Sequence, residues 1–156
     1  MAAPSPTSRE TPDGIPLKDG YQTLITIEDD PNISFWEKTV QPPGLDGGDK
    51  VDITTMHNTA LRTYVARSLT EMTDMRTRVS YDPDAYDEIL AVINTNDVIT
   101  VKFSDGSTIA FWGYLRSFEP ADISEGSQPE ADIVICPTNY DGSAEQNFVL
   151  DEVAGT

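Results

Sequence analysis

Residues 96–118 read NDVITVKFSDGSTIAFWGYLRSF, and this stretch decides the fold. Two runs in which apolar and polar residues alternate flank Ser104, Asp105 and Gly106, which is the pattern of a β-hairpin. A two-residue Asp-Gly turn would scatter the apolar side chains over both faces, whereas a three-residue loop with left-handed Gly106 gathers them on one face. The longer loop is therefore predicted. It places opposite each other Ile99 and Phe111, Val101 and Ile109, and Lys102 and Thr108.

Further strands are predicted on both sides of this hairpin. Alternation and β-branched content mark residues 21–27, 33–39, 50–56, 72–81 and 131–135. The first two are expected to form an opening hairpin, and the last is expected to close the sheet. Residues 61–69 fit either a short strand or an ordered loop, and the sequence leaves both open.

One helix is predicted after Tyr81. Asp82 can cap it, and proline at position 83 suits the first helical position. The stripe expected to face the core consists of Tyr86, Ile89, Leu90 and Ile93. Together these elements predict a mainly β fold, a β-sandwich or barrel of about seven strands with one flanking α-helix.

Proline and glycine divide the rest of the chain. Residues 1–20 contain four prolines and are predicted to be a flexible N-terminal arm. Residues 21–138 form the predicted β-domain, and residues 139–156 a sparse acidic C-terminal tail. Between the second and third strands, residues 41–49 are expected to form a long loop without regular structure, because prolines fix their dihedral angles and glycines loosen theirs.

The net charge of −17 excludes ordinary nucleic-acid binding, which requires clustered Lys and Arg. No apolar run approaches the roughly 20 residues that span a bilayer, and the first residues lack the order of a secretory signal. The protein is expected to be soluble, made in a cytoplasm and not inserted in a membrane. Cys136 has no partner for an internal disulfide and is expected to pack as a small hydrophobe.

No catalytic, metal or cofactor site is predicted. His57 lacks the further nitrogen or sulfur ligands that a metal requires, and Asp46, Asp49 and Asp52 lack the spacing of a calcium loop. The acids around the start of the helix are explained by capping and the helix dipole without any acid–base chemistry. The two tryptophans, Trp36 and Trp112, are interpreted as core or interface anchors.

The ordered segments resemble the tail tube proteins, also called major tail proteins, of long-tailed bacteriophages. The resemblance covers residues 20–139 and follows the family's order. It rests on FWEKT (35–39), PPGLDGGD (42–49), VDITTMHNT (51–59), YDP (81–83), FSDGS (103–107) and FWGYL (111–115).

The resemblance implies a structural, non-enzymatic virion protein. Subunits of that family form hexameric rings that stack into a hollow tube, through which DNA passes without adhering. The implied partners are further copies of the chain and the tape-measure, terminator and distal tail proteins, in a virion tail assembled in the host bacterial cytoplasm. Two alternatives remain open: a tube protein of a contractile injection or secretion apparatus, and an acidic β-domain that binds a basic protein or mimics DNA. A third alternative, a hydrolase using Asp84 and Asp87, has only the helix acids in its favour.

For such an assembly, the loop and the N-terminal arm are expected to become ordered when a neighbouring ring arrives. The residues expected at a subunit or ring-stacking interface are Trp36, Pro42, Pro43, Gly44, Leu45, Asp46, Gly47, Gly48, Met56, His57, Asn58 and Trp112. Acidic side chains are expected to line the channel, since they leave the phosphate backbone without a cationic partner.

Overall fold

The hairpin of residues 96–118 lies in the middle of the fold. The computed structural model describes residues 23–29, 35–81, 83–103 and 106–151. Ile99 lies opposite Phe111 and Val101 opposite Ile109, which confirms the predicted register. Gly106 has the left-handed φ of 91°, and the conformations of the two preceding loop residues lie outside the described part. All four apolar residues are buried, so this face of the hairpin belongs to the core.

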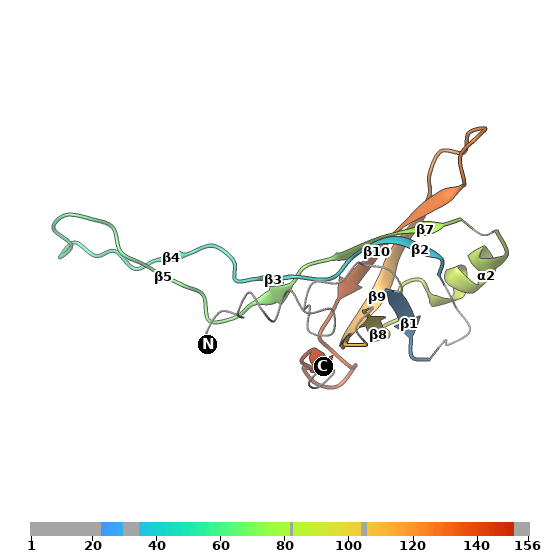
Figure 1. Ribbon diagram of the computed structural model, residues 1–156. Coiled ribbons are helices and arrows are strands. Elements are labelled where there is room, and N and C mark those ends of the chain that lie inside the picture. The colour runs from blue at the N-terminus through green and yellow to red at the C-terminus, as the bar shows by residue number, and fades with distance from the viewer. Residues whose placement is uncertain (1–22, 30–34, 82, 104–105, 152–156) are drawn as a thin grey trace, which may run out of the picture.

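Around the hairpin the described residues form a seven-stranded antiparallel sheet in the order β1-β8-β9-β10-β7-β2, with β11 also paired to β9 (Figure 1). The strands of this sheet are β1 (Leu24–Ile27), β2 (Glu37–Gln41), β7 (Met75–Ser80), β8 (Asp97–Lys102), β9 (Thr108–Pro120), β10 (Glu130–Pro137) and β11 (Val149–Asp151). Because β9 is long, its first part pairs with β8 and β11, and its later part pairs with β10.

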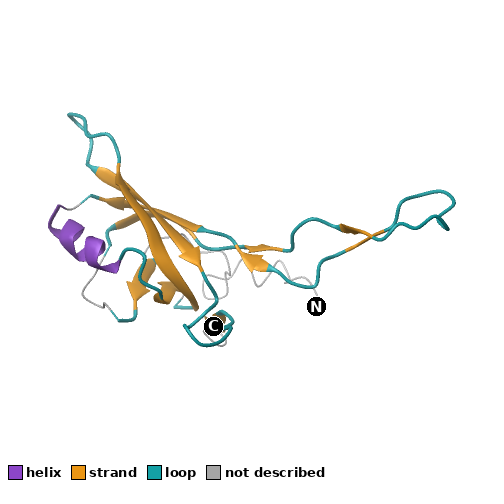
Figure 2. Cartoon of the chain, turned by 180° about the vertical axis from the view of Figure 1, so that it is seen from behind, coloured by secondary structure: helices purple, strands orange, loops and turns teal. Residues whose placement is uncertain are grey.

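One hydrophobic core joins the two halves of this sheet. Alternate residues of β1 and β8 and alternate residues of β7 and β10 belong to the same buried cluster, so the sheet must curl around it. The most deeply buried side chains are Phe111, Met75, Ile99, Leu115, Ile133, Ile135 and Val101. The helix α2 (Pro83–Val92) lies at one end of the sheet, as Figure 2 shows. The predicted mainly β fold with a flanking helix is confirmed.

The prediction for the helix is confirmed in position, and its predicted core-facing stripe is confirmed at Ile89 and Ile93 and wrong at Leu90. Ile89 and Val92 are buried, whereas Tyr86 is 38% and Leu90 50% exposed. The ring of Tyr86 meets the edge of Phe118, with 5.8 Å between centroids. Since the helix packs on the end of the sheet, chiefly against β9, only a narrow strip of its surface is covered. Asp82, the predicted cap, lies outside the described residues.

The predicted opening hairpin is wrong. β1 pairs with β8 and β2 pairs with β7, so the two strands lie at opposite edges of the sheet. The pairing of β1 with β8 places Ile25 and Ile27 opposite Val101 and Ile99, and because all four are buried, packing in the core favours this pairing. Curling nevertheless brings the two edges together, because Glu37 Oε1 accepts a hydrogen bond of 3.0 Å from the backbone N–H of Ile25.

This contact places a carboxylate between two strand edges. Burial raises the pKa of Glu37 above its ordinary 4.5, and the hydrogen bond from Ile25 only partly offsets that rise. A carboxylate with a raised pKa stabilises the fold while it is protonated, and this contribution is lost as the pH rises through the pKa of the folded state. At neutral pH the Glu37 carboxylate is charged, and Glu37 therefore stabilises the fold less than it does at low pH.

Glu37→Gln is expected to raise the melting temperature at pH 7 and to leave it unchanged near pH 4. The amide keeps an oxygen that accepts from Ile25 and has no charge to desolvate. Thermal denaturation at both pH values checks this, with Glu125→Gln, an exposed loop residue, as the control for net charge. A lower melting temperature for Glu37→Gln at pH 7 would show that burial of the charged Glu37 carboxylate does not destabilise the fold.

Between β2 and β7 the chain leaves the sheet altogether. Residues 42–74, called the arm here, run outward and back, with two short paired segments (Figure 1). These segments are β3 (Leu45–Asp46) with β6 (Glu71–Met72), and β4 (Val51–Asp52) with β5 (Tyr64–Val65). The prediction of a strand over residues 50–56 is thus confirmed only at Val51 and Asp52. The expected absence of regular structure in residues 41–49 is wrong at Gln41, which ends β2, and at β3. Within the part of the chain that the structure describes, each of these pairings joins two strands and no more.

The end of the chain also differs from a plain tail. Val149–Asp151 forms β11 against the start of β9, and Asn96 Nδ2 donates a 2.6 Å hydrogen bond to the Tyr140 carbonyl. This strand was not predicted, because three residues are too few for an alternation signal. Cys136 is half-buried on the outer face of β10, where burial raises the pKa of its thiol. The domain boundaries at residues 20 and 138 stay predictions, and the N-terminal arm lies outside the described residues.

Candidate assembly surface

The side chains of the arm are almost all exposed. Every residue from 44 to 71 is exposed, including eight large apolar or aromatic side chains. Met56 is 101%, Leu69 82% and Leu61 81% exposed. The others are Leu45, Val51, Ile53, Tyr64 and Val65. A soluble monomer rarely displays so many apolar groups on one projection, so the arm has the character of a contact surface.

The tip of the arm nevertheless has a defined shape, which Asn58 holds. Its Oδ1 accepts from the Thr55 N–H at 3.0 Å, and its Nδ2 donates to the Leu61 carbonyl at 3.0 Å and to Thr63 Oγ1 at 2.8 Å. The Ile53 N–H donates to the Thr63 carbonyl at 3.0 Å. The turn between the two sides of the arm is therefore fixed by polar contacts, while its apolar side chains point outward.

Polar contacts also hold the two sides of the arm together nearer the sheet. Arg67 Nε donates across the arm to the Asp49 carbonyl at 2.8 Å, and within the outgoing side the Gly48 N–H donates to Asp46 Oδ1 at 2.8 Å. Gly48 adopts a φ of 75°, which glycine tolerates without strain. At the base, the Thr73 N–H donates to the Gly44 carbonyl at 2.9 Å. Polar contacts thus fix the course of residues 44–71, and the hydrophobic core is reached only at the base of the arm, by Met72.

The structure brings together most of the predicted interface residues on this arm. Pro42, Pro43 and Gly44 lie at its base, and Leu45, Asp46, Gly47 and Gly48 follow on the outgoing side. Met56, His57 and Asn58 form the tip. The tryptophans lie elsewhere: Trp36 is 68% exposed beside β2, and Trp112 is half-buried on β9.

The returning side of the arm was missed by sequence reasoning. Leu61 and Leu69 are as exposed as the predicted residues, Tyr64 is exposed to a smaller extent, and Arg62 and Arg67 accompany them. The available signal was the undecided segment 61–69, whose apolar residues fit no period because they face no core.

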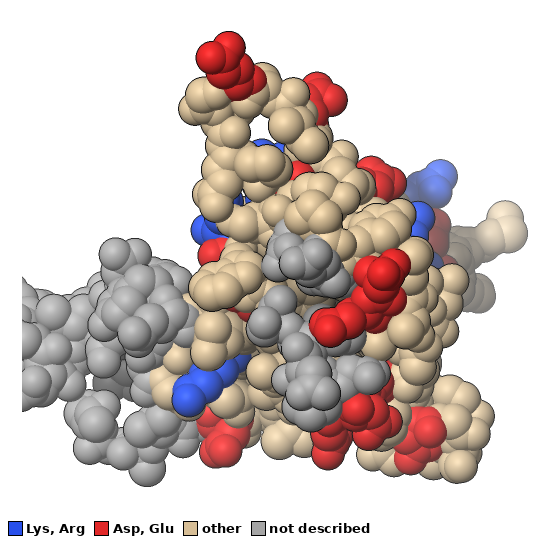
Figure 3. Space-filling view, turned by 90° about the vertical axis from the view of Figure 1, so that its right-hand side faces the viewer, with Lys and Arg blue, Asp and Glu red and all other residues tan. Residues whose placement is uncertain are grey.

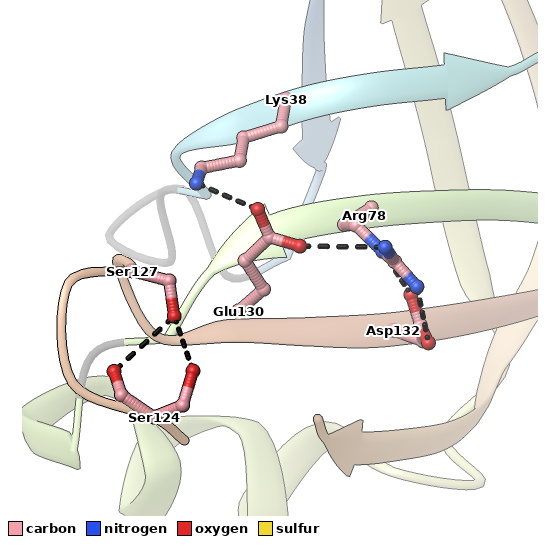
Figure 4. A network of polar contacts seen from close by, with 6 residues as sticks. All are labelled: Lys38, Arg78, Ser124, Ser127, Glu130 and Asp132. Atoms are coloured by element: carbon pink, nitrogen blue, oxygen red, sulfur yellow. Dashed lines mark hydrogen bonds and ion pairs between the residues drawn. The ribbon is translucent and has the colours of Figure 1, made fainter. Parts of the chain in front are cut away.

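A second polar feature covers the outer face of the sheet (Figure 4). Glu130 accepts from Lys38 Nζ at 2.8 Å and lies 3.4 Å from Arg78, and Arg78 also contacts Asp132 at 2.9 Å. These pairs join β2, β7 and β10. The hydrogen bond from Lys38 lowers the pKa of Glu130, and the hydrogen bond from Arg78 lowers the pKa of Asp132. Because the groups are largely accessible to solvent, these ion pairs fix the positions of the side chains but contribute little to the free energy of unfolding.

Two other features are absent from the described part of the chain, a cluster of metal-ligating side chains and a membrane-spanning helix. No three His, Cys, Asp or Glu side chains there lie close enough to hold a metal ion. No helix there has the length and apolar character needed to cross a membrane.

Comparison with known proteins yields structural likeness only. No protein-family model and no curated protein sequence matches the chain. It is similar to a chain in the tail of an empty gene transfer agent particle refined with C6 symmetry, at TM-score 0.59 and 11% identity, covering 88% of this chain and 100% of that one. It is also similar to a chain of the native gene transfer agent virion, at TM-score 0.57 and 11% identity, over 78% and 95%.

A third likeness, at TM-score 0.55 and 10% identity, is to a chain in the sixfold-symmetrised baseplate of the anti-feeding prophage. It covers 96% of this chain and 97% of that chain. Since the identities are low, these comparisons establish a shared fold: a mainly β chain of the kind found in tail-like particles.

Proposed function

We propose that this chain is a structural, non-enzymatic subunit of a phage-tail-like particle. In this proposal, copies assemble into stacked hexameric rings that form a hollow tail tube, and DNA passes through the tube during ejection. The observation that carries the proposal is the arm, which holds eight large apolar or aromatic side chains exposed on a projection with no core.

The arm fits an assembly contact better than a small-molecule site. Burying an exposed side chain of the size of Leu or Met stabilises a contact by about 1.5–3 kcal/mol, and the arm offers several. The two sides of the arm are already fixed by hydrogen bonds at the tip and the base, so little further ordering is needed on binding. In this proposal the loop of residues 41–49 therefore differs from the expectation that it becomes ordered only when a neighbouring ring arrives. A partner that buries the arm would therefore gain apolar contact at low entropic cost.

The structural likeness supports the same role. One of the similar chains belongs to a tail refined with C6 symmetry, and this chain covers all of that chain. A ring of six copies requires a heterologous contact repeated around an axis, and an arm at one end of each subunit suits contacts between successive rings. Tape-measure, terminator and distal tail proteins are the further partners expected in such a tail.

Passage of DNA requires that the tube does not bind phosphate. The chain has 27 acidic and 10 basic residues, so its surface repels DNA. On the outer face of the sheet, Lys38, Arg78 and Arg116 each lie within 4 Å of a carboxylate. A cation that is already paired with a carboxylate attracts phosphate less strongly than an unpaired cation does.

A tube in a contractile injection apparatus is a second candidate, because the likeness to the anti-feeding prophage chain extends over 96% of this chain. The alternative of an acidic module that binds a basic protein through charge does not account for the exposed apolar side chains of the arm.

Negative-stain microscopy of the purified protein over a range of concentrations tests the proposal. Rings or hollow filaments are expected above a critical concentration, with sedimentation showing the matching loss of monomer. A protein that stays monomeric at every concentration, and is missing from the tails of the particles that its host produces, would rule the proposal out.

A further inference from the structure

Positive charge gathers on the outer part of the arm, against the trend of the whole chain. Residues 50–70, called the outer arm, contain the cations Lys50, Arg62 and Arg67 and a single acid, Asp52. The chain as a whole carries 27 acids and 10 cations. The outer arm is therefore both apolar and basic.

These cations remain available to a partner. Arg62 contacts Asp52 only at 3.5 Å, and its side chain is 73% exposed. Lys50 Nζ lies 3.9 Å above the ring of Tyr64, and Arg67 Nε donates a hydrogen bond to the backbone carbonyl of Asp49. Among the described residues, Arg62 alone of these three cations is paired with a carboxylate, at the long distance of 3.5 Å.

The opposite end of the molecule has the complementary character. It consists of the exposed side of α2 and the turn that joins β9 to β10, and it is called the acidic end here. Residues 79–101 and 117–156 contain no Lys or Arg. The exposed residues of the acidic end are Tyr86, Asp87, Glu88 and Leu90 on the helix and Asp122, Ile123 and Glu125 on the turn. Figure 3 shows this end, where acidic side chains outnumber basic ones.

The outer arm and the acidic end point in opposite directions. In Figures 1 and 2 the arm extends from one end of the sheet, while α2 and the β9–β10 turn lie at the other. Two complementary surfaces at opposite ends of one subunit are what a head-to-tail contact between identical copies requires.

We infer that the outer arm of one copy docks on the acidic end of another copy. This inference rests on the proposed function and names the receptor surface for the arm. The apolar residues of the two surfaces supply most of the affinity, and the charges set the direction. An arm-to-arm contact would oppose cations and an end-to-end contact would oppose acids, so both wrong orientations are disfavoured.

Charge reversal on each side tests the inference. Lys50→Glu with Arg62→Glu reverses the arm, and Asp87→Lys with Glu88→Lys reverses the acidic end. Each pair of changes should raise the critical concentration for assembly by about tenfold or more at low salt, because like charges then meet. All four changes in one chain should restore assembly, because a negative arm then meets a positive end.

A second reversal protects the test against misfolding of the helix, since lysines near a helix N-terminus oppose its dipole. Asp122→Lys with Glu125→Lys lies on the turn and should behave in the same way. The matched control is Glu145→Lys with Asp151→Lys, two exposed acids outside both surfaces, which changes the net charge equally and should leave assembly unaffected. Melting temperatures establish that each variant is folded.

Three results decide the matter. Rescue of the reversed arm by either reversed end, with defects that weaken as salt rises, supports the inference. If the wild type assembles but neither reversed end rescues the reversed arm, the arm docks elsewhere and the inference is overturned while the proposed function stands. If the wild type forms no assembly at all, the proposed function itself fails.

Discussion

Replacing Met56 and Leu61 by serine should leave the single subunit as stable as the wild type and prevent its assembly. Met56 at the tip of the arm is 101% exposed and Leu61 on its returning side 81%, so the free energy of unfolding should change by less than about 0.5 kcal/mol. In an assembled tube the same side chains would be buried, at about 1.5–3 kcal/mol each. The critical concentration should therefore rise about a hundredfold or more.

Thermal denaturation and sedimentation measure the two quantities separately. A suitable control is Val149→Ser with Leu150→Ser, because these residues are 61% and 60% exposed and lie in β11, away from the arm. Normal assembly of the arm variant would show that exposed apolar groups at the tip take no part in the contact. Loss of assembly in both variants would show that assembly depends on exposed apolar surface in general and not on the arm in particular.

Gly113→Val should give the largest loss of subunit stability. A Cβ atom at this position would lie 2.8 Å from the Cys136 carbonyl oxygen and 3.3 Å from both Phe111 Cε2 and Pro137 Cα. Two of these three neighbours are backbone atoms of β10, which cannot move without breaking the pairing with β9. We expect a loss of about 3 kcal/mol, equivalent to a fall in melting temperature of about 6–12 °C.

Gly47→Val is the matched control, because a Cβ atom there meets nothing within 4 Å. Melting curves of the two variants should differ clearly, with Gly47→Val close to the wild type. A Gly113→Val protein that melts with the wild type would show that β9 and β10 do not approach each other as described.

The parts of the fold that were predicted correctly are those in which neighbouring residues carry the signal. Alternation alone identified β7, β8, β9 and β10, because each has one face against the core and one face outward. The register of the central hairpin followed from matching apolar residues on one face. Proline and acidic residues located α2.

The errors arose where contacts distant in sequence decide the structure. Nothing in the two edge strands indicates that β1 pairs with β8 and β2 with β7, far along the chain. The orientation of α2 depends on how little of it the sheet covers, which leaves Tyr86 and Leu90 exposed. The strand β11 is too short to recognise without its partner.

The candidate surface was predicted in part for the same reason. Proline and glycine marked the start of the arm, and the resemblance to tail tube proteins drew attention to the tip at Met56, His57 and Asn58. The returning side, with Leu61 and Leu69, has no periodicity because it packs on nothing within the subunit. The returning side can be recognised as an exposed apolar surface only from the exposure of its side chains in the structure. The concentration of cations on the outer arm becomes meaningful only beside the acidic end.

A cryo-electron microscopy reconstruction of the assembled protein tests the central claim most directly. We predict a hollow cylinder of stacked sixfold rings, with the arm of each subunit reaching into the neighbouring ring and Met56 and Leu61 buried there. A reconstruction in which the arm projects freely into solvent, or in which the subunits form no closed ring around a channel, would contradict the account.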